Sequence, residues 1–156
     1  MLPVSTAATS YYVEFRGRSE DGGFGHSYIT LGYADAGGHT HRTTIFGLVP
    51  TTRDDEFLSQ FAVPVSGSIA VTKSDFTPHP DVSYRVSIAR ADYVRIVRDI
   101  AALQNSWTIY ALVGQNCNDL IADIARSVGL ATPALTIQLP VAYVAELKAV
   151  NAPNRK

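Results

Sequence analysis

The segments of this chain that resemble strands come first, and those that resemble helices come last. In the first half, apolar and polar residues alternate in short runs between glycines and prolines, which is the two-residue period of a β-strand. From residue 91 onward, apolar residues recur every three or four positions, which is the period of an amphipathic helix. This order predicts an α+β domain in which helices pack on an antiparallel β-sheet.

The strand pattern also predicts how the second and third strands meet. A glycine-rich turn at residues 34–38 joins them into a hairpin, in which Tyr33 is expected to face His39. The last strand alternates most regularly and is expected to be central in the sheet. We expect strands at residues 11–16, 27–33, 39–46, 68–72 and 82–88, and helices at residues 91–105, 117–129 and 140–150. The acidic run at residues 54–56 is expected in a solvated loop.

Size and composition set limits on what the chain can do. The 156 residues predict a single domain spanning residues 1–156, and the 46% of apolar residues can form a core. A net charge of −1 without any basic run argues against a nucleic-acid partner. No apolar stretch approaches the ~20 residues that cross a bilayer. The N-terminus lacks a signal-peptide pattern. A secreted or periplasmic location stays open, as does the oligomeric state.

The only cysteine, Cys117, stands where a helix is expected to begin. Unpaired backbone N–H groups at a helix start carry partial positive charge and stabilise a thiolate. The neighbouring residues are polar rather than apolar, and a single thiol excludes an internal disulfide. Cys117 is therefore a candidate nucleophile. The alternative is an inert thiol packed on the inner face of the helix.

A thiol nucleophile needs a base, and His26 is the best placed of the four histidines. It follows Gly25 and opens a strand, so a helix start packed on this strand start would bring it near Cys117. His39 and His41 are expected to be exposed at the hairpin tip. They lack a third metal ligand nearby, so we expect no metal or other cofactor.

Two motifs lie far apart in the chain. Gly25-His26-Ser-Tyr-Ile-Thr-Leu opens an early strand, and Tyr110-x-Leu-x-x-x-Asn116-Cys117 precedes a late helix. Together they resemble the permuted branch of the papain-like NlpC/P60 thiol hydrolases, in which the histidine likewise precedes the cysteine. The resemblance implies a circularly permuted papain-like fold and a cysteine–histidine dyad, with a third polar residue that orients the imidazole.

The third residue and the oxyanion donors are less clearly marked. If Tyr33 faces His39, the nearest polar residue on the face of His26 is Thr44, although a one-residue bulge would change this count. The backbone N–H of Cys117 and the side chain of Gln115 or Asn116 are candidate oxyanion donors and substrate-binding groups. Alternatively, Asn116 or its neighbour Asn118 caps the helix, and Gln115 is exposed.

The resemblance covers roughly residues 10–150 and implies hydrolysis of peptide or amide bonds, often in cell-wall peptides. We therefore expect a cysteine peptidase or amidase. Cys117 would attack the amide and His26 would transfer the proton, through an acyl-enzyme. The expected partner is a peptide or amide substrate, such as peptidoglycan. Two alternatives stay open: an acyltransferase that uses the same thioester, and an inactive module that binds a peptide or a protein.

Overall fold

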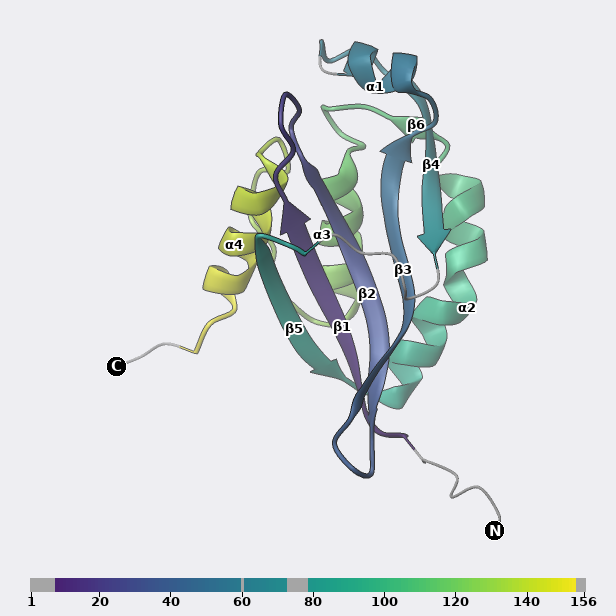
Figure 1. The fold of residues 1–156 in the computed structure, drawn as a ribbon, viewed down its shortest axis with the longest axis vertical. Helices are drawn as coiled ribbons and strands as arrows, with labels where there is room; N and C mark the ends of the chain where they lie inside the picture. The colour runs from purple at the N-terminus through teal and green to yellow at the C-terminus, as the bar shows by residue number, and fades with distance from the viewer. Residues whose placement is uncertain (1–7, 60, 73–78, 154–156) are drawn as a thin grey trace.

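The computed structural model describes residues 8–59, 61–72 and 79–153, and it confirms the α+β class (Figure 1). Within these residues, six strands form one sheet in the order β5-β1-β2-β3-β4-β6, and every neighbouring pair is antiparallel. The strands are β1 (Ala8–Arg18), β2 (His26–Asp35), β3 (Thr40–Pro50), β4 (Val65–Thr72), β5 (Val82–Ile88) and β6 (Ile109–Tyr110). The helices are α1 (Arg53–Ser59), α2 (Arg90–Ser106), α3 (Cys117–Ser127) and α4 (Pro140–Val150).

Helices α2, α3 and α4 lie on one face of the sheet, whereas α1 lies between the end of β3 and the start of β4 (Figure 1). Alternate residues of the central strands point toward the three long helices and form the core with them. Each large side chain buried in this way stabilises the fold by about 1.5–3 kcal/mol. The fully buried members include Phe15, Ile29, Leu31, Phe46, Leu48, Ile121 and Tyr143.

The residues between these core positions point to the opposite face of the sheet. On β1, Glu14 is buried and accepts hydrogen bonds from Arg16 and Arg85, each at 2.6 Å. The guanidinium of Arg85 also lies 4.1 Å from the ring centre of Tyr12. The second face therefore carries paired charges and aromatic rings, and this chemistry distinguishes it from the helix-covered face.

Three expectations about the elements were wrong. Among the described strands, β5 pairs with β1 alone and forms an edge of the sheet, because regular alternation indicates one covered face and not a central position. The acidic run at 54–56 is the first turn of α1, where its charge favours the helix dipole, and Thr52 caps that turn by accepting from the N–H of Asp55. The third wrong expectation is the pairing of β2 with β3 in the hairpin.

In the hairpin, Tyr33 pairs with His41 and not with His39. The carboxylate of Asp35 accepts hydrogen bonds from the backbone N–H groups of Gly37 and His39, each at 2.9 Å, and so builds a turn longer than the glycines alone indicated. A bulge also interrupts the pairing beyond Leu31. Both features shift the residues of β3 relative to those of β2.

Candidate functional site

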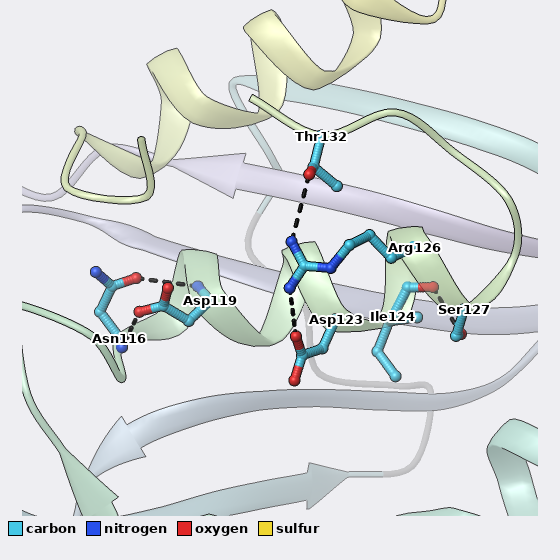
Figure 2. A network of polar contacts seen from close by, with 7 residues as sticks. All are labelled: Asn116, Asp119, Asp123, Ile124, Arg126, Ser127 and Thr132. Atoms are coloured by element: carbon cyan, nitrogen blue, oxygen red, sulfur yellow. Dashed lines mark hydrogen bonds and ion pairs between the residues drawn. The ribbon is translucent and has the colours of Figure 1, made fainter. Parts of the chain in front are cut away.

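Asn116 holds the start of helix α3. Its Oδ1 accepts hydrogen bonds from the backbone N–H groups of Asn118 (2.8 Å) and Asp119 (3.1 Å). The carboxylate of Asp119 in turn accepts from the N–H of Asn116 at 2.7 Å. Figure 2 shows this capping box and, further along α3, the ion pair between Arg126 and Asp123. The box satisfies the unpaired donors of the first turn and fixes where the helix begins.

The rest of the Asn116 side chain is also engaged. Its Nδ2 donates to the carbonyl oxygens of Leu112 (2.7 Å) and Thr136 (3.4 Å), so both polar atoms of this buried amide have partners. The capping alternative is confirmed, and no donor of this side chain is left over for an oxyanion. Gln115 closes a turn through backbone hydrogen bonds with Ala111, and it lines neither of the two cavities described below.

Cys117 is the first residue of α3, and only 4% of its surface is exposed. It lines a cavity of about 190 Å³ together with Tyr110 and several apolar side chains. The hydroxyl of Tyr110 lies close to the side chain and the backbone of Cys117. Burial, and after it the charge of Cys117 and hydrogen bonding with its side chain, raise the pKa of Tyr110, whereas hydrogen bonding with the backbone of Cys117 lowers it. Tyr110 therefore keeps its proton at neutral pH and can donate it in a hydrogen bond at the thiol.

The start of β2 packs against the start of α3, as expected from the sequence. The hydroxyl of Ser27 donates a hydrogen bond of 2.8 Å to Oδ1 of Asn118, and both groups are buried. Successive residues of a strand point to opposite faces of the sheet. Because Ser27 points toward α3, its neighbour His26 points to the other face.

The position of Gly47 gives independent evidence for this orientation. A Cβ atom added to Gly47 would point away from the core, because its neighbours Phe46 and Leu48 both point into it. That Cβ would lie 2.8 Å from Nε2 of His26. The imidazole therefore occupies the space that the missing side chain leaves, and it stacks on Tyr28 with ring centres 5.8 Å apart.

The expected dyad is consequently not assembled in this conformation. Cys117 lies with α3 on one face of the sheet, and the imidazole of His26 lies on the other. In the part of the chain that the structure describes, no hydrogen bond or ion pair joins the two groups. Burial, with a smaller contribution from the positive charge of Arg18, lowers the pKa of His26 to about 4. At neutral pH the imidazole is therefore uncharged and a weak base.

His26 lines a second cavity, of about 250 Å³, whose walls carry charged side chains. Arg18, Glu20 and Glu56 contribute to this lining. Three residues, Phe24, Gly25 and Tyr110, line both cavities. The two predicted site residues are thus neighbours across a shared wall and not direct partners.

Thr44 lies far from His26. It pairs with Leu31, which is five residues along β2 from His26, so at ~3.3 Å per residue the separation is about 16 Å. Thr44 therefore cannot orient the imidazole here. The cause is the hairpin pairing, which differs by two residues from the expected one and includes the bulge that the sequence analysis allowed for.

His39 lies in the turn of the hairpin, and His41 lies next to it near the start of β3. His41 and His39 are exposed, as expected, with side chains 43% and 80% exposed. Nε2 of His41 lies 2.7 Å from Asp35, and this hydrogen bond, followed by the backbone N–H of His39, lowers the pKa of Asp35 to about 2. The described residues include no group of three histidine, cysteine or acidic side chains able to hold a metal ion. Nor is any helix among them long and apolar enough to cross a membrane.

Several residues of the site escaped the sequence analysis. Ser27 joins the strand to the helix through Asn118, which the sequence offered only as an alternative helix cap, and Tyr110 was noted only as part of a motif. Ile137 and Leu139 come from the segment before α4 and reach the cavity of Cys117. The alternation of Ile29 and Leu31 with Ser27 was the one signal that could have placed Ser27 on the face of α3. Comparisons of the chain with known protein families, with curated proteins and with solved structures find no match.

Proposed function

We propose that this chain is a cysteine hydrolase that cleaves an amide bond through an acyl-enzyme on Cys117. The observation that supports this function is the position of the thiol at the first turn of α3, in the wall of a cavity. A helix start stabilises a thiolate. The thiolate sulfur attacks the carbonyl carbon, the carbon–nitrogen bond breaks, and the amine leaves with a proton. Water then hydrolyses the thioester and releases the acid.

Tyr110 has a role of its own in this proposal. Its hydroxyl lies at both the thiol and the backbone of Cys117, where charge develops during the attack. A hydroxyl that keeps its proton can donate a hydrogen bond to the thiolate or to the oxyanion. We assign Tyr110 to this role in place of the Asn116 side chain, because that side chain caps the helix.

In the proposed reaction His26 takes the proton of the Cys117 thiol and then passes it to the leaving amine, and for this the imidazole has to leave the position described above. Its ring has to leave Gly47 and turn around the start of β2 toward the wall that the two cavities share. Substrate binding at that wall would favour the rotated conformation of the ring. The substrate class suggested by the sequence resemblance is a peptide, cell-wall peptides included, and an acceptor other than water would make the same thioester an acyltransferase intermediate.

A second candidate is a module that binds a peptide or a protein without catalysis. The orientation of His26, away from the thiol and with a lowered pKa, favours this candidate. The two candidates differ in what happens after binding, because only an enzyme transfers an acyl group to Cys117.

Mass spectrometry of the intact protein after mixing with activated acyl esters tests the proposal. We expect an acyl adduct in the wild type, none in Cys117→Ala, and acyl transfer slowed by about 10²-fold or more in His26→Ala. Unfolding curves of the three proteins check that each is folded. Absence of an adduct in folded wild-type protein would favour the binding module.

A further inference from the structure

The cavity of Cys117 has an apolar lining that the proposed function does not explain by itself. Besides Tyr110, the side chains of Phe24, Leu112, Ile137, Leu139 and Pro140 line it. Phe24, Ile137 and Leu139 are 44%, 51% and 58% exposed. Exposed apolar surface is unfavourable in water, and its concentration around a cavity is typical of a binding site.

The polar groups of the same lining are bonded within the protein. Asn116 caps the helix, as described above. The buried Asn118 accepts a hydrogen bond from Ser27 and donates from Nδ2 to the carbonyl oxygens of Thr136 (2.9 Å) and Gln138 (3.0 Å). Nε2 of Gln138 donates to the carbonyl of Leu135 and to Glu146, each at 2.8 Å. The side-chain amide N–H donors around the cavity are thus already used, so a ligand with several polar groups would find few partners there.

Among the described residues that line this cavity none is charged, in contrast to the cavity of His26 next to it. An ionised group moved into an apolar site without a partner pays a large desolvation cost. The lining therefore selects against substrates that carry a charge beside the reacting carbonyl.

The volume indicates what size of group fits. An apolar cavity of about 150 Å³ binds benzene. The cavity of Cys117, at about 190 Å³, has room for a group of benzyl size.

We propose that this cavity binds an uncharged apolar group of about benzyl size, on the acyl side of the amide that Cys117 attacks. This inference rests on the proposed function, because only an attack by Cys117 defines an acyl side. It adds the substrate class, which is amides of apolar acids, such as phenylalanyl peptides, rather than amides with a charged side chain at that position.

Binding to the inactive variant Cys117→Ala tests the inference without requiring turnover. The probes are N-acetylphenylalaninamide and N-acetylaspartamide, followed by ligand-observed NMR. We expect the phenylalanine amide to bind about tenfold more tightly or better. Adding Ile137→Asp, which places a charge in the lining, should weaken its binding by about tenfold or more.

The matched control is Leu135→Asp, two residues away, which is 67% exposed and does not line the cavity. It should leave binding unchanged. Both positions are exposed, so both variants should fold, and their unfolding curves check this. Equal binding of the two amides, no binding of either, or equal effects of the two substitutions would overturn the inference. This binding experiment does not measure acyl transfer. A wild type that forms no acyl adduct would therefore contradict the proposed function without affecting the measured preference of the cavity for an apolar group.

Discussion

Two cavities share one wall but differ in chemistry. The cavity of Cys117 is formed by the start of α3 and the segment before α4, and its lining is apolar or bonded within the protein. The cavity of His26 is formed by the end of β1, the start of β2, the end of β3 and α1, and charged side chains line it. The two residues that the sequence motifs paired therefore belong to different environments. Proximity of a strand start to a helix start does not set the direction in which a side chain points.

The largest effect should come from breaking the wall of the Cys117 cavity. Asn116→Ala removes the cap of α3 and leaves the carbonyl oxygens of Leu112 and Thr136 without this partner. We expect the free energy of unfolding to fall by about 2–4 kcal/mol, as measured by urea denaturation. Gln115→Ala, next in the chain, should change it by less than about 0.5 kcal/mol. Similar losses for the two variants would show that the cap does not hold the cavity.

The cavity of His26 should respond to pH. Because the folded pKa of about 4 lies below the ordinary 6.5, the unfolded chain binds a proton between these values that the folded chain does not. The contribution of His26 to the free energy of unfolding is therefore fully present above about pH 6.5 and is lost as the pH falls toward about 4. Allowing for partial exposure of the ring, we expect a loss of about 2 kcal/mol.

Unfolding curves measured from neutral pH down to about pH 4 check this. His26→Gln should remove the decline in that range. The carboxyl of Asp35, with its pKa lowered from 3.8 to about 2, contributes stability that is lost only below that range. If His26→Gln keeps the full decline, the imidazole does not have the buried environment described here.

A smaller effect is expected where the His26 ring lies against the sheet. In Gly47→Ala the added Cβ would meet Nε2 of His26 at 2.8 Å and Cβ of Tyr28 at 3.2 Å. The ring has to shift, at a cost of about 1–2 kcal/mol in unfolding free energy. Gly23→Ala, whose Cβ meets only the Glu20 side chain at 3.6 Å or beyond, should be neutral within about 0.5 kcal/mol. Neutral behaviour of Gly47→Ala would place the imidazole elsewhere.

The smallest effect concerns the charge beside His26. Arg18 lowers the pKa of His26, so Arg18→Gln should raise it, as followed by NMR titration of the ring. Arg53→Gln, on α1 and outside the lining of this cavity, is the control. Stability should hardly change, because the ion pair of Arg18 with Glu20 at 3.7 Å is a surface contact. An unchanged pKa of His26 in Arg18→Gln would contradict the charged character of the cavity.

The elements were predictable because each has a local cause. Strand β5 and helix α4 begin and end where the alternation and the helical period predicted. The cap at Asn116 follows from its side chain and from Asp119 three residues later. Helix α1 was missed because prolines surround it, although Thr52 and the acidic turn marked its start.

The site was less predictable because it depends on contacts between distant segments. The turn built by Asp35 and the bulge on β3 decide which residue of β3 faces His26. Neither feature has a local sequence pattern from which the pairing of β2 with β3 could be predicted. The apolar lining from Ile137 and Leu139 comes from an irregular segment, whose path is set by hydrogen bonds to Asn118 and not by a repeat.

The alkylation rate of Cys117 by iodoacetamide near pH 6 tests most directly whether this buried thiol is a nucleophile in its own cavity. The comparison is between the folded wild type and the same chain unfolded in urea at the same pH. We predict that the folded thiol reacts several-fold faster, because it lies at the first turn of α3, where the partial positive charge of a helix start favours attack by the sulfur as an anion. His26→Ala should not change this rate, because the ring lies on the other face of the sheet. A folded thiol that reacts more slowly than the unfolded one would show a packed, inert cysteine and contradict the proposed chemistry.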